Sequence, residues 1–393
     1  MTQLRFPAPL RLLLTTLGLL AVLTGLPFWS AFGGTDESCA RVLQIRGSSA
    51  PAMRSSDQIS ELVVMTYNVK NLFKMVGDFD RFEPNNYRQT GDAKDKPLSE
   101  MQGVAQAILD SSPDLIVLQE IEGLQTLEDF NKQFLNSGYT AVLHPGNDAR
   151  GIEIGFLIKK DLPLQVALES HRDVRWNDPA DNNRSVPLFS RDLPSLLFFR
   201  QSDDPKTATP LFVMIGNHGK SKRDRPGDPN SNLLRAAQYR EARVIVDGYQ
   251  KKYGNDLPIL LAGDFNTDVK NSPELQPLRE KMQDVLDLVE ATGASRITHT
   301  YHPHEGGPQM AQLDGILVNQ RLALSVLAAA IYRYKDQNGV VKPIPQTYQE
   351  REKNPSDHFP IVLRLSTKLI FPEAHPAKPT SSVVSPLLFR RTA

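Results

Sequence analysis

Short apolar runs rich in β-branched residues recur along the middle of this chain, and polar residues flank each run. Runs of this length that lack polar alternation are typical of strands buried on both faces. The sequence therefore predicts buried strands within residues 62–65, 115–118, 156–158, 211–215, 259–261, 316–318 and 361–363.

Apolar residues at helical spacing lie between several of these runs. Ser99 and Gln102 form a capping-box pattern, and Met101, Val104 and Ile108 then follow on one side of a predicted helix. Two further helices are predicted over residues 232–246 and 274–289, the second after Ser272-Pro273 as a start signal. Helices that alternate with buried strands predict an α/β architecture in which helices cover the sheets.

The alternating pattern occupies residues 59–367, which we predict to form one large domain. Residues 34–58 are largely polar, with glycine, serine and proline, and are predicted to be a linker. Residues 368–393 carry several prolines and serines and are predicted to be a loose tail.

The first 33 residues have the order of a secretory signal peptide. Arg5 and Arg11 precede an apolar run over residues 12–23, Pro27 ends it, and small residues follow. The same segment is also compatible with an uncleaved membrane anchor, because no charged residue lies between Arg11 and Asp36. We expect an extracytoplasmic protein, secreted or periplasmic, with the membrane involved only if this segment is retained.

Composition limits the means by which the protein can attract a phosphate. Lys plus Arg and Asp plus Glu both number 45 in the 393 residues, so the formal net charge is zero. Attraction to a polyanion must therefore come from a local cluster of basic residues. Cys39 is the only cysteine, so the chain forms no internal disulfide.

Polar groups with metal and acid–base chemistry stand at the ends of the predicted strands. Asn68, Glu120, His218 and Asp264 come at or after the ends of their strands, whereas Asp314 and Asp357-His358 precede theirs. If the last two strands run antiparallel to the others, all these groups meet at one edge. Carboxylates crowded there repel one another, and a hard divalent cation held by oxygen ligands offsets the repulsion.

Six motifs in this order resemble those of the endonuclease/exonuclease/phosphatase superfamily, in its deoxyribonuclease I-like form, over residues 60–366. They are Met65-Thr66-Tyr67-Asn68, Leu118-Gln119-Glu120, Asn217-His218, Gly263-Asp264-Phe265-Asn266, Leu313-Asp314-Gly315 and Ser356-Asp357-His358-Phe359-Pro360. The resemblance implies a four-layer α/β sandwich, with two central mixed sheets flanked by helices. It also implies a metal-dependent phosphoesterase, most similar to bacterial secreted nucleases, with residues 59–367 as its catalytic domain.

The resemblance implies a role for each motif residue. Asn68, Glu120 and Asp357 are expected to hold Mg²⁺, with Mn²⁺ or Ca²⁺ as alternatives. Asp264 is expected to orient or deprotonate the attacking water. His358, steadied by Asp314, and His218 are expected to supply acid–base and charge-stabilising functions, and Asn266 to position the phosphate.

Basic residues beyond the motifs bear on the substrate. Lys220 and Lys222 closely follow His218 and are expected to grip phosphate, although a solvated charged loop is the alternative. Arg191 resembles an arginine that contacts substrate phosphate in deoxyribonuclease I-like enzymes, and a surface ion pair is its alternative. We therefore expect a phosphodiester substrate, with DNA or RNA favoured, and no protein partner is implied.

Two alternatives remain open at the level of sequence. A sphingomyelinase-like or small-molecule phosphodiesterase or phosphatase of the same superfamily has the same motifs, but no convincing apolar loop for a membrane surface is evident. His299, His302 and His304 cluster with Tyr301, which admits a zinc site or, as we favour, a loop that either faces the substrate or is merely polar.

Overall fold

The computed structural model describes residues 41–43, 53–55, 59–73, 96–303 and 306–371. The segment 1–33, most of the predicted linker and residues 372–393 lie outside these ranges, as does His304. Among the described residues, no helix has both the length and the apolar character needed to cross a membrane.

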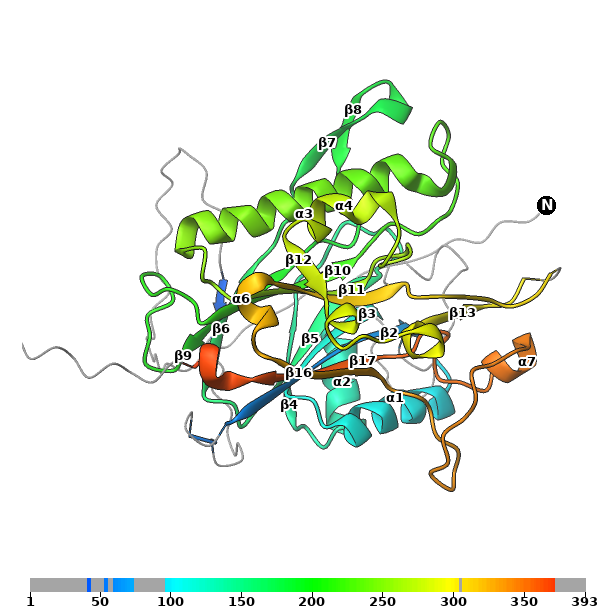
Figure 1. The fold of residues 1–393 in the computed structure, drawn as a ribbon, viewed down its shortest axis with the longest axis horizontal. Coiled ribbons are helices and arrows are strands. Elements are labelled where there is room, and N and C mark those ends of the chain that lie inside the picture. Colours follow the sequence, from blue (N-terminus) through cyan, green and yellow to red (C-terminus); the bar gives the residue numbers. More distant parts are fainter. Residues whose placement is uncertain (1–40, 44–52, 56–58, 74–95, 304–305, 372–393) are drawn as a thin grey trace, which may run out of the picture. The chain divides into compact units, whose positions relative to one another are not determined.

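Two mixed sheets form the centre of the fold (Figure 1). One sheet has the strand order β1 (Arg41–Leu43), β6 (Leu164–Glu169), β9 (Ser195–Arg200), β10 (Phe212–His218), β11 (Ile259–Asp264), β15 (Asp314–Asn319) and β12 (Met282–Asp284). The other has the order β16 (Val326–Ile331), β17 (Ile361–Ser366), β2 (Glu61–Leu72), β3 (Leu115–Ile121), β5 (Glu153–Lys159) and β4 (Tyr139–Leu143). Each predicted strand is therefore confirmed.

Successive residues of the central strands pack into different cores, which explains why the runs are apolar throughout. In β3, Val117 packs between the sheets, whereas Ile116 faces a core that includes Val104 and Ile108 of α1 (Leu98–Ser111). That outer core also contains Leu127 and Phe130 of α2 (Leu124–Phe134).

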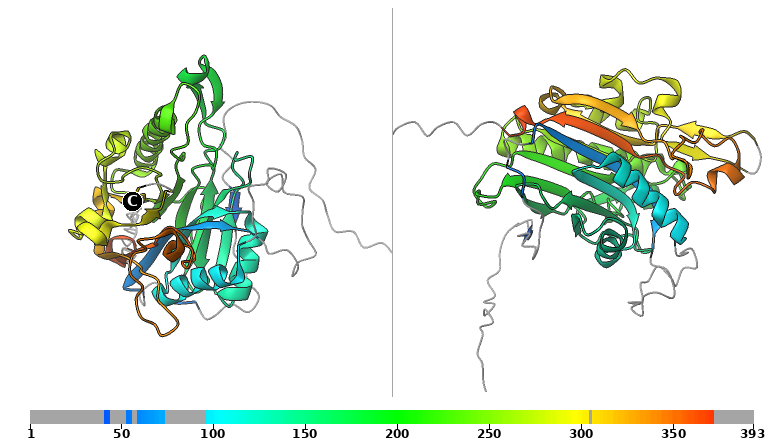
Figure 2. Two further views of the ribbon diagram at one scale, coloured as in Figure 1. Left: turned by 90° about the vertical axis from the view of Figure 1, so that its right-hand side faces the viewer. Right: turned by 90° about the horizontal axis from the view of Figure 1, so that it is seen from below.

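The outer face of the larger sheet is covered in the same way by α3 (Asn232–Tyr253), which supplies Tyr239 and Val246 to a core with Ile215 of β10. Figures 1 and 2 show α3 on one side of the paired sheets and α1 with α2 on the other. The predicted four-layer sandwich is confirmed.

The remaining elements are short. They are the helices α4 (Gln276–Arg279), α5 (Val285–Leu288), α6 (Gln320–Ala323) and α7 (Tyr348–Arg351), the hairpin of β7 (Arg175–Asp178) with β8 (Arg184–Pro187), and the hairpin of β13 (His299–Tyr301) with β14 (Gln309–Ala311).

The single helix predicted over 274–289 is wrong. The chain forms α4, then the edge strand β12, in which Met282 pairs with Asn319, and then α5. The side chain of Asp284 accepts a hydrogen bond from the backbone N–H of Leu286 and so caps a new helix. The apolar residues suit helical spacing, but pairing with β15 satisfies the backbone of an edge strand instead.

The boundaries of three other elements also differ from the prediction. Helix α1 begins at Leu98 after Pro97, and no side chain caps it, so the predicted capping box at Ser99 does not form. Strand β1 lies within the predicted linker and pairs with β6. Ile370, in the predicted tail, is fully buried in the core between the sheets. The ordered fold therefore extends beyond 59–367 on both sides.

Candidate active site

The ends of six strands bring the predicted site residues to one edge of the paired sheets. Strands β2 and β3 are parallel, as are β10 and β11, whereas β17 runs antiparallel to β2 and β15 antiparallel to β11. This is the antiparallel arrangement that the positions of Asp314 and Asp357 predicted. The two sheets meet at this edge, because Nδ2 of Asn68 donates a hydrogen bond to Oδ2 of Asp264 across 3.0 Å.

Asp264 lies at the centre of the group. Its Oδ2 atom accepts hydrogen bonds from Nδ2 of Asn68 and Nδ2 of Asn266, each at 3.0 Å. The Nε2 atoms of His218 and His358 lie 3.7 and 4.0 Å from the same oxygen. Burial raises the pKa of Asp264 above its ordinary value, and the positive charge of His358 only partly offsets this effect. A carboxylate with a raised pKa is a stronger proton acceptor than an exposed aspartate.

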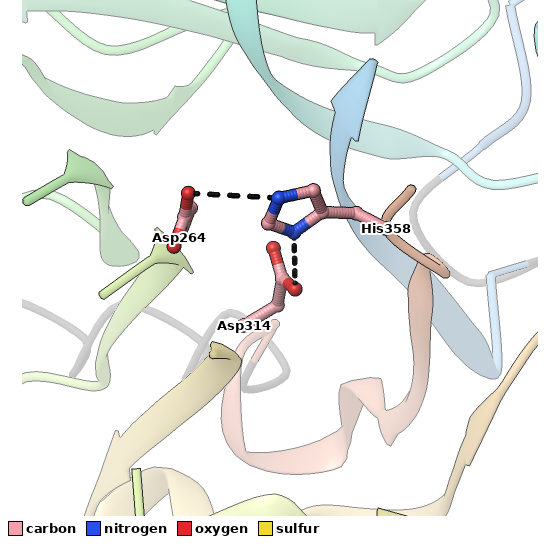
Figure 3. A group of neighbouring side chains, drawn as sticks. All are labelled: Asp264, Asp314 and His358. Carbon is pink, nitrogen blue, oxygen red and sulfur yellow. Dashed lines mark hydrogen bonds and ion pairs between the residues drawn. The ribbon is translucent and has the colours of Figure 1, made fainter. Parts of the chain in front are cut away.

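His358 is held by Asp314 on its other side (Figure 3). Its Nδ1 atom lies 2.8 Å from Oδ2 of Asp314, and both side chains are buried. Burial alone would lower the pKa of His358, but the charge and hydrogen bond of Asp314 outweigh it and raise that pKa. The ring is therefore protonated near neutral pH, and it presents Nε2–H toward Asp264.

His218 is buried next to Asp264, as its register partner on the neighbouring parallel strand. Burial, together with the charges of Arg191 and His358, lowers the pKa of His218 well below its ordinary value. The site therefore pairs a neutral imidazole with a charged one. Gly263 permits this close packing of strands, because it has φ of 154° and a Cβ atom there would overlap the carbonyl oxygen of Asn217.

Asn68 and Glu120 offer oxygen atoms next to Asp264. Nδ2 of Asn68 lies 3.3 Å from Oε1 of Glu120 as well as 3.0 Å from Asp264, so two carboxylates share one polar partner. Oδ1 of Asn68 accepts a hydrogen bond from the backbone N–H of Lys70 at 3.1 Å and retains a second lone pair. Oxygen donors from amides and carboxylates are those that Mg²⁺ prefers, so these residues suit a divalent cation.

Glu120 is held in an unusual backbone conformation. Its φ is 68°, in the left-handed region that residues with side chains rarely adopt. Its Oε2 atom accepts a hydrogen bond from the backbone N–H of Asn71 at 2.9 Å. Such strain persists where the surrounding structure imposes it, and it is concentrated at functional sites.

Asp357, the third predicted metal ligand, is half-buried and has different neighbours. Its Oδ2 atom lies 3.7 Å from Nη1 of Arg351 and 3.9 Å from Nε2 of His299. Burial alone would raise the pKa of Asp357, but His358 and the other nearby positive charges lower it below its ordinary value. Among the described residues, a compact group of acidic and histidine side chains is formed by Asp264, Asp314 and His358, whose ligand atoms lie within 4.8 Å of one another. Protonated His358 has no lone pair to offer a cation, so the oxygen atoms of Asn68 and Glu120 suit a divalent cation better.

The predicted phosphate-binding residues occupy different positions around the site. Arg191 is buried, not part of a surface ion pair, and its guanidinium lies 3.1 Å from Asp148 and donates to the carbonyl of Gly219. Lys220 is half-buried, and burial together with the charges of Arg191 and Arg150 lowers its pKa to about 8. Lys222 is exposed, and its charge contributes to lowering the pKa of His299 to about 3, after burial and His358.

The predicted histidine cluster does not converge. His299 faces His358, with ring centroids 4.5 Å apart, whereas His302 contacts the carbonyl oxygen of Pro345 at 3.2 Å. His304 lies outside the described residues. His299 and His302 therefore do not form a shared zinc site, and the face of β13 that carries His299 belongs to the active-site edge.

Lys96 is a buried residue that the sequence did not single out. Its Nζ donates to the carbonyl oxygens of Lys70 and Pro355, at 3.1 and 2.7 Å, and to Glu100 at 2.9 Å. It thus ties the irregular end of β2, just after Asn68, to the segment that precedes Asp357. A lone lysine before a helix carries no signal of this role.

Tyr334 is a second such residue. Its hydroxyl bonds to the carbonyl oxygen of His358 and lies 2.7 Å from the hydroxyl of Tyr67, and both rings are buried. Tyr334 therefore fixes the backbone of His358, while Asp314 fixes its ring.

Comparison with known proteins agrees with this geometry. Residues 63–367 match the model of the endonuclease/exonuclease/phosphatase family. No curated protein matches the chain.

Several solved structures are similar to the chain at low identity and with TM-scores below 0.5. Truncated TDP2 from Caenorhabditis elegans is 16% identical with a TM-score of 0.48, over 78% of this chain and 97% of that one. TDP2 from D. rerio, in complex with a single-strand DNA product, is 15% identical with a TM-score of 0.49, over 79% and 100%. An endonuclease/exonuclease/phosphatase family protein from Bacteroides thetaiotaomicron is 17% identical with a TM-score of 0.45, over 78% and 97%. Similarity at this level says nothing about the substrate of this chain.

Proposed function

This chain belongs to the endonuclease/exonuclease/phosphatase family, and on that premise we propose that it is a divalent-metal-dependent phosphodiesterase that cleaves nucleic acid. The observation that carries the proposal is the convergence on Oδ2 of Asp264. Two amides bind that oxygen, and a neutral and a protonated imidazole face it. This arrangement suits removal of a proton from water beside a phosphate whose negative charge must be offset.

In the proposed reaction, water attacks phosphorus and its proton passes to Asp264. A new phosphorus–oxygen bond forms as the bond to the leaving oxygen breaks. Protonated His358, held by Asp314, stabilises the additional negative charge on the phosphoryl oxygens. Neutral His218 donates a hydrogen bond from Nε2 to a phosphoryl oxygen. Solvent returns a proton to the leaving oxygen. Asn266 keeps Asp264 oriented, because its Nδ2 atom donates to Oδ2 of Asp264 and to the carbonyl oxygen of Gly219. Positioning of the phosphate by this side chain requires exchange of one of these two hydrogen bonds.

We assign the cation to Asn68 and Glu120, with Asp357 as the expected third contributor, and Mg²⁺ as the expected ion. When bound, such an ion supplies Lewis-acid stabilisation of the phosphate charge. Asn68 and Glu120 are supported by their position next to Asp264. The support for Asp357 is its lowered pKa, which keeps it ionised beside the site.

Nucleic acid is the proposed substrate because basic groups gather on the His218 side of the site. Arg191 and Lys220 lie close enough to His218 for their charges to lower its pKa, and Lys222 is exposed farther along the same loop. A chain with no net charge has to attract a polyanion through such a local cluster. Export, through the segment over residues 1–33, is part of the proposal.

The test is activity of the purified mature protein with Mg²⁺ on plasmid DNA, RNA, sphingomyelin and a small chromogenic diester. We expect cleavage of DNA or RNA that falls steeply with salt. Hydrolysis of sphingomyelin without cleavage of nucleic acid would replace the proposal with the lipid phosphodiesterase.

N-terminal sequencing of the protein from its native host should begin near Gly34, and a cytoplasmic protein that retains Met1 would rule out export.

A further inference from the structure

Two tyrosines stand apart from the other aromatic residues of the described chain. Tyr301 is 48% exposed and Tyr348 is 50% exposed, whereas every other described phenylalanine, tyrosine and tryptophan is at least partly buried. Exposed rings that lie close to a site are more informative than scattered apolar residues, because large aromatic side chains are enriched where proteins bind partners and ligands.

Tyr301 projects on the active-site face of β13. His299, two residues before it, packs against His358 with the two rings tilted by 52°, and its Nε2 atom lies 3.9 Å from Oδ2 of Asp357. Residues two apart on a strand share a face, so Tyr301 emerges on the side that carries these contacts. Pairing of Tyr301 with Gln309 in the β13–β14 hairpin fixes its backbone.

Tyr348 is the first residue of α7. A capping box between Thr347 and Glu350 fixes this short helix. The guanidinium carbon of Arg351 lies 4.9 Å from the centre of the Tyr348 ring, and Nη1 of the same arginine lies 3.7 Å from Oδ2 of Asp357. One side chain thus separates the ring from a predicted metal ligand, and half of the Tyr348 surface remains exposed.

The two tyrosines belong to neighbouring segments. Nε2 of His302 lies 3.2 Å from the carbonyl oxygen of Pro345, which joins the end of β13 to the turn before α7. Figure 1 shows β13 and α7 at the same end of the fold.

We propose that Tyr301 and Tyr348 form a stacking subsite for an unpaired nucleobase adjacent to the scissile phosphate. The inference rests on the proposed nuclease function and narrows it to substrates in which a base can leave the stack. A base is planar and lies one sugar away from its phosphate, which matches a Tyr348 ring that only Arg351 separates from Asp357. Tyr301 follows His299, which itself contacts Asp357, by two residues. The neighbouring side chains Arg351, Glu352 and His302 are polar and do not suit an acyl chain.

The test compares two single-stranded substrates of equal length and phosphate number, an oligothymidylate and an oligomer of abasic spacers. Three forms are assayed in Mg²⁺: the wild type, the double variant Tyr301→Leu/Tyr348→Leu, and the double variant Tyr301→Phe/Tyr348→Phe. We expect the wild type to prefer the base-containing strand in kcat/KM, and the leucine variant to reduce that preference on the order of tenfold. The phenylalanine variant should keep the preference, because it keeps both rings.

Leu324→Ala serves as the matched control, because Leu324 is 72% exposed and lies in the turn after α6, outside the proposed subsite. It should leave the preference unchanged. A leucine variant that prefers the base-containing strand as strongly as the wild type does would overturn the subsite and leave the nuclease function standing. Failure of the wild type to cleave any nucleic acid would instead overturn the proposed function.

Discussion

His218 and Asp264 are register partners on adjacent parallel strands, and Nε2 of the histidine lies 3.7 Å from Oδ2 of the aspartate. Parallel strands point their carboxyl ends in the same direction, so β10 and β11 deliver both groups to one edge. The pKa of His218 is lowered and that of Asp264 is raised, so burial favours the uncharged form of each. This pairing leads to the first prediction.

Asp264→Asn should lower kcat by about 10²–10⁴-fold, because the proton acceptor is lost. It should also stabilise the fold in chelator at pH 8. The folded-state pKa of Asp264 lies above its unfolded value, so the native protein binds more protons and stability falls as pH rises through that window. Urea unfolding at pH 5 and pH 8 measures this. The exposed Asp256→Asn serves as control, and equal loss of stability with pH in the variant and the wild type would contradict the assignment.

Removal of divalent cations should abolish activity, and Mg²⁺ or Mn²⁺ should restore it. Glu120→Gln removes one negative charge next to Asn68 and should raise the Mg²⁺ concentration needed for half-maximal activity. Isothermal titration calorimetry should show weaker binding of Mg²⁺ to the same variant. Glu128→Gln, on the exposed surface of α2, should change neither value, and full wild-type activity in EDTA would end the metal hypothesis.

Asp314→Asn should shift the alkaline limb of the pH–rate profile to lower pH. Asp314 raises the pKa of His358, so without its charge the histidine loses its proton at a lower pH. The pH dependence of kcat/KM and the NMR titration of the imidazole should shift together. An unchanged alkaline limb would show that protonated His358 is not required.

Cleavage of long nucleic acid should weaken above pH 8 as Lys220 loses its charge. Burial and the neighbouring arginines lower the pKa of Lys220 to about 8, so the side chain is charged below that pH and neutral above it. Lys220→Arg should keep KM for a long strand constant between pH 7 and pH 9.

The triple change Lys220→Ala, Lys222→Ala and Arg223→Ala should impair cleavage of a long strand far more than that of a small diester, and an equal effect on both would count against phosphate gripping.

Lys96→Met should lower the free energy of unfolding by about 3 kcal/mol, because it leaves Glu100 and two carbonyl oxygens without their buried partner. Denaturant titration measures the loss. Lys132→Met, an exposed substitution on α2, should stay within about 0.5 kcal/mol of the wild type. A Lys96→Met protein as stable as the wild type would show that the contacts of Lys96 with the segments of Lys70 and Pro355 do not stabilise the fold.

Much of the fold followed from local pattern. A run such as Leu115–Leu118 is apolar throughout because Val117 faces the other sheet and Ile116 faces α1, so burial on both faces is visible in the residues themselves. The expected meeting of Asn68, Glu120, Asp314 and Asp357 at one edge required the last two strands to be reversed, and β15 and β17 do run antiparallel to their neighbours β11 and β2.

Local pattern failed where two structures compete for the same residues. The apolar spacing of residues 274–289 suits a helix, yet Met282–Asp284 forms a strand, because β15 offers an edge with which its backbone can pair. That edge is formed by Asp314–Asn319, which lie far along the chain. No window of sequence around Met282 contains this information.

The sequence by itself thus determined the layers, the strand ends and the identities of the groups at one edge. Only the tertiary structure decided their chemistry, because a pKa depends on burial and on charges brought from elsewhere in the chain. His218 is neutral and His358 protonated although both are buried histidines, since Arg191 acts on one and Asp314 on the other. In the same way, Lys96 can join two distant segments only because the fold brings the carbonyl oxygens of Lys70 and Pro355 to it.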